Sequence, residues 1–558
     1  MKFIHIPKYL LGILFTLSSV FVNAQNGSSP PPQDWFLLDP ADNQVQGLSV
    51  EKTYATLLKG KPSRTVIVAV IDSGIDIEHE DLSGVIWTNE DEIAGNGIDD
   101  DNNGYIDDVH GWNFIGGKNG NVNEDTYELT REYIRLDKKF GSVESNKVSR
   151  KEKSEYEQYL AIKDKFEKLK EKNQEQFDGY SKQYNLMKNV FSNLEKSIDT
   201  VKQILDTESL TKDQVEEYKT NDPELLFSKG MILSVYNNSG YDGPADSLLI
   251  AFHEDLEYYE EAVDYFRVIV EYGYNVNFDS REIVGDNPNE LQEKYYGNND
   301  VEGPDPSHGT HVAGIIGADR TNNLGIKGIA DNVKIMSVRA VPNGDERDKD
   351  VANAIIYAVD NGAHIINMSF GKDFSPNKEL VDKAVQYAEQ KGVLLIHAAG
   401  NDGDDIDDKD NFPTRKYNNN KQATNWLEIG ASSWGADDNF VGNFSNYGKK
   451  SVDLFSPGVD IYSTTPDNSY KSQQGTSMAS PAAAGVAAMI MSYFPEFSAT
   501  QVRNILIQST RKFDNLKVIK PGDRNLISFG DLSVSGGLIN AYEAAKLAAS
   551  LQGQTVER

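Results

Sequence analysis

Thr-Val-Ile-Val-Ala-Val-Ile-Asp-Ser-Gly, residues 65–74, is the stretch that decides the fold of this 558-residue chain. Its first six residues are apolar or β-branched without polar alternation, which is typical of a strand buried on both faces of a parallel sheet. The run stops at Asp72, so a carboxylate directly follows the predicted strand. Parallel sheets place functional residues at this end of their strands.

Downstream of Gly309 the sequence alternates short apolar runs with segments of helical spacing. The predicted strands are 333–338, 364–368, 393–397 and 427–430, and the predicted helices between them are 351–361 and 378–391. This alternation indicates a parallel sheet with helices on both faces. The predicted fold class is therefore α/β, interrupted by a helical insertion.

The composition excludes several functions. The chain carries 86 Asp and Glu against 55 Lys and Arg, a formal net charge of −31, which would repel phosphate groups and argues against a nucleic-acid partner. Because there is no Cys, disulfides, iron–sulfur clusters, thiolate zinc sites and cysteine nucleophiles are excluded. The acidity suits an exported protein that binds calcium.

The first residues have the pattern of a signal peptide. Two lysines precede an apolar stretch at 9–22, and small residues follow at 22–24. We predict a signal peptide at 1–24, an N-terminal arm at 25–64, and a secreted or periplasmic protein. The alternative, a membrane anchor, is disfavoured because the apolar stretch is short, and no later segment predicts stable membrane insertion after cleavage.

Residues 124–300 differ in character, being rich in Lys, Glu and Gln with regularly spaced apolar residues. Their clearest pattern is an unbroken 3,4 spacing, typical of a coiled-coil helix about 43 Å long. Its members are Phe177, Tyr180, Tyr184, Met187, Phe191, Leu194, Ile198, Val201 and Leu205. A second amphipathic helix is predicted at 246–271. We interpret the region as a helical insertion that is either a plain spacer or an arm that binds a protein partner or gates access.

Two further segments carry residues suited to catalysis. His308 lies in Ser-His-Gly-Thr-His-Val-Ala-Gly, residues 307–314, and Ser477 lies in Gly-Thr-Ser-Met-Ala-Ser-Pro, residues 475–481. Because Pro is tolerated near a helix start, Ser477 is predicted at a helix N-terminus, where free N–H groups can hold an oxyanion. A Ser hydroxyl needs an imidazole to take its proton, and the imidazole needs a carboxylate such as Asp72. Taken singly, each residue also has a structural interpretation.

The segments 70–75, 308–314 and 475–481 together resemble the three catalytic signatures of subtilisin-like serine proteases, the subtilase or peptidase S8 family, in that family's order. The resemblance covers roughly 35–114 and 302–549 and implies a catalytic domain at 65–123 and 301–549, with a C-terminal tail at 550–558. The family usually has a far shorter stretch between Asp and His, so the insertion is a departure from its pattern.

The resemblance also implies roles for individual residues. Asp72 would orient the base, His308 would be the base and Ser477 the nucleophile, whereas His311 would be structural. Asn401, in Ala-Ala-Gly-Asn at 398–401, would donate its side-chain amide to the oxyanion. The segments predicted to hold an extended peptide by strand addition follow the strands at 364–368 and 393–397; their residues are Ser369, Phe370, Gly371, Ala399 and Gly400.

An acidic loop at 99–108 predicts a calcium site. Its oxygen-bearing residues alternate, and a Gly stands where an EF-hand loop turns sharply. The predicted ligands are Asp99, Asp101, Asn103, the Tyr105 carbonyl and Asp107. The bidentate Glu expected at position 12 is absent, since that position is His110, so a solvated acidic turn is the alternative. The resemblance supports calcium, because subtilases commonly use it for stability.

A second acidic run follows Asn401 and comprises Asp402, Asp404, Asp405, Asp407, Asp408 and Asp410. It is interpreted as a solvated loop, a further cation site or a preference for basic substrate side chains.

The predicted function is a secreted serine endopeptidase that acts on polypeptides through an acyl-enzyme. The alternative is a catalytically silent scaffold whose insertion binds a protein partner. An α/β-hydrolase esterase is disfavoured, because Ala479 stands where its Gly-x-Ser-x-Gly motif needs Gly.

Overall fold

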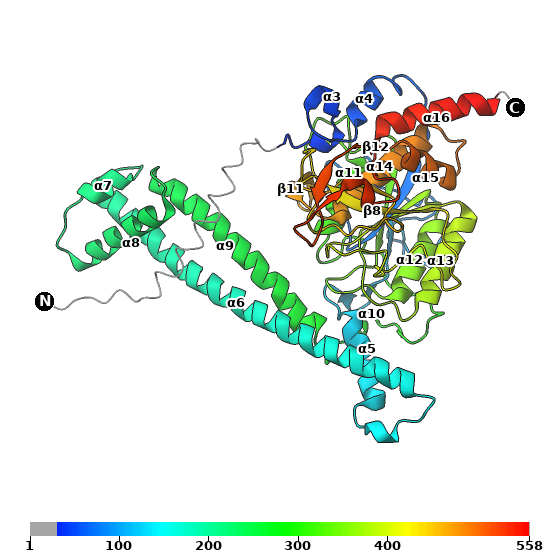
Figure 1. Cartoon of the computed structure of the whole chain (residues 1–558), viewed down its shortest axis with the longest axis horizontal. Helices are drawn as coiled ribbons and strands as arrows, with labels where there is room; N and C mark the ends of the chain where they lie inside the picture. The colour runs from blue at the N-terminus through cyan, green and yellow to red at the C-terminus, as the bar shows by residue number, and fades with distance from the viewer. Residues whose placement is uncertain (1–30, 557–558) are drawn as a thin grey trace. The chain divides into compact units, whose positions relative to one another are not determined.

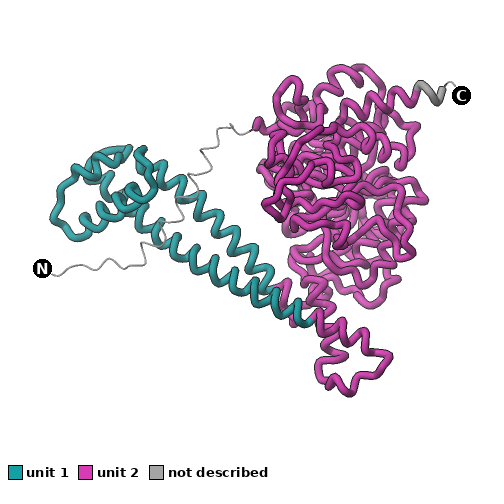
Figure 2. Tube along the Cα trace, viewed as in Figure 1, with its two compact units in different colours: residues 1–30, 163–271 teal, residues 31–162, 272–558 magenta. Residues whose placement is uncertain are grey.

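The computed structural model describes residues 31–556, so the predicted signal peptide at 1–24 lies outside the described residues. Two compact units separate within them, residues 163–271 and the remainder (Figure 2). The larger unit contains a nine-stranded sheet, and the smaller one is helical. No helix in the range 31–556 combines the length and the apolar character that a membrane crossing requires.

The strands of the sheet are ordered β12-β15-β9-β8-β7-β6-β1-β5-β2. Their bounds are β1 Val66–Asp72, β2 Gly111–Asn113, β5 Val333–Arg339, β6 Ile365–Met368, β7 Leu394–Ala398, β8 Trp426–Ser432, β9 Leu454–Pro457, β12 Arg511–Lys512 and β15 Gly537–Leu538. Neighbouring strands are parallel from β15 to β2, and only β12 runs antiparallel to its neighbour. The predicted α/β fold with a parallel sheet is confirmed.

Strand β1 shows why the sheet is covered on both faces. Val66, Val68 and Val70 belong to one apolar cluster, together with residues of α11 (Ser307–Gly317) and α14 (Thr476–Tyr493). The intervening Ala69 and Ile71 belong to a second cluster. That cluster contains residues of α12 (Asp348–Asp360) and α13 (Lys378–Lys391), which lie side by side in Figure 1. Because side chains alternate along a strand, an unbroken apolar run supplies two cores.

The other elements of the larger unit frame this sheet. They are α3 Pro40–Asn43, α4 Val50–Ala55, α5 Glu128–Phe140, α10 Arg281–Val284, α15 Ala499–Gln508 and α16 Ala541–Val556, with the two-stranded ribbons β3–β4 (Gly116–Gly117, Gly120–Asn121), β10–β11 (Ile461–Thr465, Ser469–Gln473) and β13–β14 (Lys517–Ile519, Leu526–Ser528). The described part of the N-terminal arm, 31–64, packs on this unit, since buried Trp35 donates its indole N–H to the Asp460 carbonyl at 3.0 Å. The C-terminal helix continues beyond the predicted start of the tail.

The smaller unit contains both predicted helices, the first of them longer than predicted, and two further helices between them. In chain order the helices are α6 Lys153–Leu205, which begins in the larger unit, α7 Lys212–Glu217, α8 Pro223–Ser239 and α9 Ala245–Val268, which ends in a π-helical turn at Ile269–Gly273. Within the unit, the predicted seam of α6 packs on α9: Met187 forms one buried apolar cluster with Phe252 and Leu256, and the rings of Tyr180 and Phe266 stack 5.3 Å apart. The predicted helix at 246–271 is thereby confirmed.

The helical unit, 163–271, is narrower than the predicted insertion, 124–300. The flank at 272–300 buries an aromatic side chain on the sheet, and the flank at 124–162 is tied to the sheet unit by the ion pair of Glu128 with Lys372. The aromatic side chain is that of Tyr296, which packs edge-on against Phe114 with ring centroids 5.8 Å apart. The change of composition at residue 124 marks the departure from the family pattern, whereas the boundary of the compact unit depends on tertiary packing.

Candidate active site

Three predicted site residues follow neighbouring parallel strands. Strands β1, β6 and β7 are adjacent in the sheet. Asp72 ends β1, Ser369 follows β6, and Asn401 lies three residues beyond β7. Because the strands are parallel, their carboxyl ends meet at the same edge, which places these residues together although about 330 positions separate the first from the last.

Asp72 and His308 form a hydrogen-bonded pair. The Asp72 Oδ1 atom lies 2.7 Å from His308 Nδ1 and also accepts the Ser73 N–H at 2.8 Å. Asp72 is 2% exposed, whereas the His308 side chain is 38% exposed. Burial opposes a charge on the imidazole, but the Asp72 carboxylate outweighs it and raises the pKa of His308 above its ordinary value. One ring nitrogen is therefore oriented, and the ring remains accessible.

The small residues around His308 allow a helix to approach the strand end closely. A Cβ atom on Gly309 would lie 2.1 Å from the Gly74 carbonyl oxygen, so only glycine fits there. His311, one turn later, is buried and lies within hydrogen-bond distance of two carbonyls, those of Ile461 and Lys471. Burial lowers the pKa of His311 to about 4, so it is neutral and structural at neutral pH.

Ser477 lies in the first turn of α14, at the predicted helix N-terminus. Pro481 has no N–H for the Ser477 carbonyl four residues earlier, and that carbonyl instead accepts the Ser369 hydroxyl at 2.9 Å. In return the Ser477 hydroxyl donates to the Ser369 carbonyl at 3.0 Å. No hydrogen bond joins Ser477 to His308 within the part of the chain that the structure describes. Catalytic hydrogen bonds are often formed only when substrate is bound.

Asn401 is held against the start of α14 by Thr476. Its Oδ1 atom accepts both the Thr476 N–H, at 2.9 Å, and the Thr476 hydroxyl, at 3.0 Å. With Oδ1 occupied, Nδ2 remains to donate elsewhere. A Cβ atom placed on Gly475 would lie 3.5 Å from Asn401 Nδ2 and 3.6 Å from the Ser477 backbone nitrogen. Both nitrogen atoms therefore lie close to one position beside Gly475. Sequence reasoning did not identify Thr476, because a hydroxyl in a loop motif has no distinctive pattern.

The residues predicted to bind substrate border the same edge. Ser369 also accepts a hydrogen bond from the Asn367 amide at 2.9 Å, which anchors the segment after β6. Gly371 approaches Asn411 so closely that a Cβ atom would lie 2.4 Å from its Oδ1. Gly400 has a φ of 100° and donates its N–H to the Thr476 hydroxyl at 3.1 Å, while Ala399 is fully buried. Contacts with neighbouring residues thus hold both segments, 369–371 and 399–400, in place.

Lys372, which follows Gly371, is a buried cation between two carboxylates. Its side chain is 2% exposed, and its Nζ atom lies 3.0 Å from Glu128 Oε2 and 2.8 Å from Asp348 Oδ1. Burial opposes the charge, but Glu128 and Asp348 outweigh it and raise the pKa of Lys372. Because Glu128 begins α5, this ion pair joins the flank of the insertion to the segment after β6.

Lys372→Met is expected to lower the free energy of unfolding by about 3–5 kcal/mol, because it leaves Glu128 and Asp348 buried without their shared cation. Urea denaturation followed by fluorescence measures this change. The matched control is Lys383→Met, which removes an exposed partner of Glu379 and should have no measurable effect. Equal midpoints for wild type and Lys372→Met would contradict the prediction.

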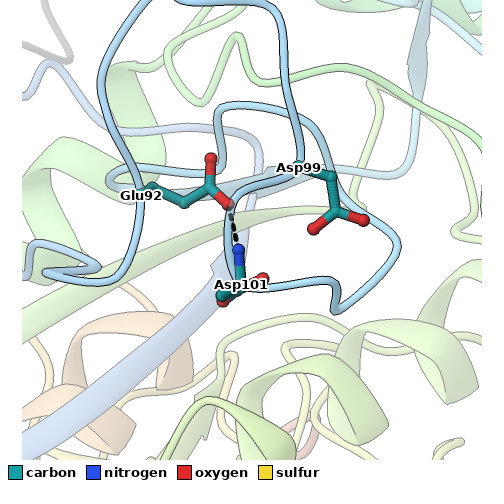
Figure 3. Close-up of side chains that lie close together, drawn as sticks. All are labelled: Glu92, Asp99 and Asp101. Atoms are coloured by element: carbon teal, nitrogen blue, oxygen red, sulfur yellow. Dashed lines mark hydrogen bonds between the residues drawn. The ribbon is translucent and has the colours of Figure 1, made fainter.

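The acidic loop groups three carboxylates differently from the predicted set. One oxygen each of Glu92, Asp99 and Asp101 lies within 4.8 Å of the others (Figure 3). Asp107 instead accepts the N–H groups of Asn96 and Gly97 at 3.1 and 2.9 Å. The remaining predicted ligands, Asn103 and Tyr105, lie in the same turn, where Asn103 Oδ1 accepts the Tyr105 N–H at 2.8 Å. Glu92 was not predicted, because it precedes the motif by seven residues in a segment without periodicity.

Comparison with known proteins places this chain in a family. The family model described as "Subtilase family" matches residues 63–530. The chain is 43% identical over 189 residues to "Thermophilic serine proteinase" of Bacillus sp. (strain AK1), covering 33% of this chain and 43% of the relative. It is 36% identical over 240 residues both to "Alkaline elastase YaB" of Bacillus sp. (strain YaB) and to "Subtilisin Savinase" of Lederbergia lenta. Those matches cover 43% of this chain, and 55% and 77% of the relatives respectively.

The chain belongs to the subtilase family, in which it is a member with a helical insertion between Asp72 and His308. The match spans about half the length of the first relatives, 43% and 55%. The matched relatives named above are proteases by their descriptions.

Proposed function

We propose that this protein is an exported serine endopeptidase that hydrolyses peptide bonds in polypeptides. The observation that carries the proposal is the 2.7 Å hydrogen bond between Asp72 and His308. This bond orients one nitrogen of the imidazole, and the Asp72 carboxylate raises the pKa of His308. The position of Ser477 at the start of α14 supports it. Membership of the subtilase family supports the same chemistry.

The proposed reaction has two stages. The Ser477 oxygen attacks the scissile carbonyl carbon while His308 Nε2 takes the hydroxyl proton, and Asp72 stabilises the resulting imidazolium. The oxyanion is held by Asn401 Nδ2 and the Ser477 N–H, and His308 returns its proton to the leaving amine. Water, activated by His308, then hydrolyses the acyl-enzyme on Ser477 and restores the hydroxyl.

A serine-reactive fluorophosphonate tests this proposal directly. The protein lacking residues 1–24 should be labelled, and mass spectrometry should locate the adduct on Ser477. Labelling should be lost in Ser477→Ala and retained in Ser472→Ala, a matched control on exposed strand β11. No labelling of folded protein, or an adduct at another residue, would contradict the proposal.

Asn401→Ala is expected to lower kcat by about 10²- to 10³-fold with little change in KM, because the lost amide acts mainly on the transition state. The figure is typical of oxyanion donors in subtilisins. Steady-state kinetics on a chromogenic tetrapeptide amide measures both constants. A KM that rises in proportion to the loss in kcat/KM would assign Asn401 to ground-state binding instead.

We also propose that the acidic loop holds a structural calcium ion. The three grouped carboxylates fit a hard cation, which takes six to eight oxygen ligands. Glu92, Asp99 and Asp101 would hold it, with the predicted ligands Asn103 and Tyr105 in the same turn, whereas Asp107 binds the N–H groups of Asn96 and Gly97. The ion would clamp the loop that follows β1.

Calcium is therefore expected to raise Tm, and chelation to lower it, since a ligand that binds only the native state stabilises it. Asp101→Asn should weaken the calcium dependence of Tm measured by calorimetry. The matched control Asp408→Asn, in the second acidic run, should preserve it. The same calcium dependence in both variants would contradict the assignment of the ion to this loop.

The second acidic run keeps its three interpretations. Lys409 lies within it and pairs with Asp404 at 2.7 Å and with Asp373 at 3.3 Å, so part of the negative charge of the run is neutralised locally. A silent scaffold whose insertion binds a protein partner remains the second candidate function. It would replace the first if folded, calcium-replete protein fails to react with the fluorophosphonate.

A further inference from the structure

A second carboxylate–imidazole pair lies inside the sheet, separate from Asp72 and His308. His397 on β7 and Glu428 on β8 are register partners on adjacent parallel strands. The His397 Nδ1 atom lies 2.8 Å from Glu428 Oε1, and its Nε2 atom lies 2.8 Å from the Phe370 carbonyl oxygen. His397 is fully buried and Glu428 is 5% exposed, so neither group meets bulk water.

The hydrogen-bond partners determine how many protons His397 and Glu428 share. A carbonyl oxygen only accepts, so His397 Nε2 must carry a proton and donate it to Phe370. Glu428 Oε2 accepts the indole N–H of Trp426 at 2.8 Å. One further proton must lie between Nδ1 and Oε1, whether on the imidazole or on the carboxyl group. In either case the pair is neutral overall and the imidazole donates to Phe370.

The surroundings hold the ring in this orientation. The His397 ring packs 5.3 Å from the Trp426 ring and 6.3 Å from the Phe370 ring, measured between centroids. The nearby carboxylate of Asp453, which accepts the Glu428 N–H at 2.9 Å, is itself paired with two arginines, Arg415 and Arg503. Glu428 is thus directed at His397 without an unpaired charge beside it.

The carbonyl that His397 binds lies in the middle of the predicted substrate-binding segment, 369–371. The Ser369 carbonyl accepts the Ser477 hydroxyl, and the Phe370 carbonyl accepts His397. Successive carbonyls of an extended segment point in opposite directions. Holding the Phe370 carbonyl at His397 fixes the peptide plane between Phe370 and Gly371, directly beside the Ser369 carbonyl that meets Ser477.

We propose that His397, oriented by Glu428, is a positioning residue that clamps the Phe370 carbonyl and so presents segment 369–371 to the substrate backbone. The inference rests on the proposed function, because it concerns the same site. The Phe370 carbonyl, unlike the Ser477 hydroxyl, has no proton to give. His397 and Glu428 therefore act by orienting this carbonyl and take no part in proton transfer to the substrate.

The test compares variants that keep or remove the hydrogen bond to Phe370. Glu428→Gln keeps it, because the Gln amide can donate to Nδ1 and still accept from Trp426. His397→Phe/Glu428→Gln removes it without leaving a buried charge. If that variant does not fold, His397→Leu/Glu428→Leu replaces it, because exchanging both buried partners for apolar side chains also removes the hydrogen bond without leaving a charge. His79→Phe is the matched control, since His79 is equally buried and lies 3.2 Å from the carbonyl of Ser469 on β11.

The variant without the hydrogen bond should show a KM for a tetrapeptide amide about tenfold higher, the value of one strong hydrogen bond. Its rate of fluorophosphonate labelling, which needs no extended peptide, should change less than twofold. Glu428→Gln and His79→Phe should keep the wild-type KM. An unchanged KM in the variant without the bond, or the same rise in His79→Phe, would overturn the proposal.

Hydrogen–deuterium exchange separates this proposal from the proposed function. In full-length protein carrying Ser477→Ala, loss of the clamp should speed exchange in the peptide spanning 366–374, and Glu428→Gln should not. This measurement needs no catalysis. An inactive wild type would therefore contradict the proposed function, whereas the exchange rates would still test whether His397 holds the Phe370 carbonyl. Unchanged exchange in the variant without the bond would overturn it.

Discussion

Ser477→Ala and His308→Ala are each expected to lower kcat for peptide hydrolysis by about 10⁶-fold, and the double variant by no more than either single one. The reason is that the two side chains act as one unit: the hydroxyl is a poor nucleophile without the base, and the base has no proton to move without the hydroxyl. Residual turnover should come from Asn401 and from substrate binding.

Kinetics on a tetrapeptide amide, with the three variants and wild type prepared in parallel, measures this non-additivity. KM should stay close to the wild-type value, because neither side chain is needed to hold the peptide. Ser472→Ala again serves as the control for an exposed serine on β11. Losses that multiply in the double variant would mean that His308 and Ser477 act independently, and the proposed triad would be wrong.

Asp72→Asn is expected to lower kcat by about 10⁴-fold, because an amide can orient the imidazole in the wrong tautomer and cannot stabilise its positive charge. The structure also predicts a change in pH dependence. Activity requires neutral His308, and the Asp72 carboxylate raises the pKa of that imidazole above its ordinary value. The rise of kcat/KM with pH in the wild type should therefore lie above about pH 6.5.

Removing the carboxylate removes the group that raises the pKa of His308, while burial continues to lower it. The acid limb of kcat/KM should therefore move to lower pH in Asp72→Asn, even as the maximum falls. A profile from pH 5 to 9 measures both effects. A limb that stays in place, or that moves to higher pH, would show that Asp72 does not control the protonation of His308.

Local patterns predicted much of this molecule. The unbroken apolar run before Asp72 indicated a strand buried on both faces, and β1 contributes alternate side chains to two cores. The helix predicted at 378–391 is α13, with the same bounds. Such features follow from periodicity, which depends only on neighbours along the chain. The position of Ser477 at the start of α14 followed in the same way from Pro481.

Other features depended on contacts between distant residues. Sequence reasoning could not find that Thr476 orients the Asn401 amide, that Glu92 joins the carboxylates of the acidic loop, or that His397 reaches the Phe370 carbonyl. Each of these contacts joins separate segments through one or two hydrogen bonds or through charge, which leaves no periodic trace in the sequence.

By itself, the sequence determined the parallel α/β sheet, the order of the family motifs and the presence of a helical segment between Asp72 and His308. Only the tertiary structure decided that the compact helical unit occupies 163–271 within the predicted insertion, because Tyr296 and Glu128 in the flanks are buried or ion-paired on the sheet unit. Motifs depend on local chemistry, whereas boundaries and positioning contacts depend on which distant surfaces become buried together.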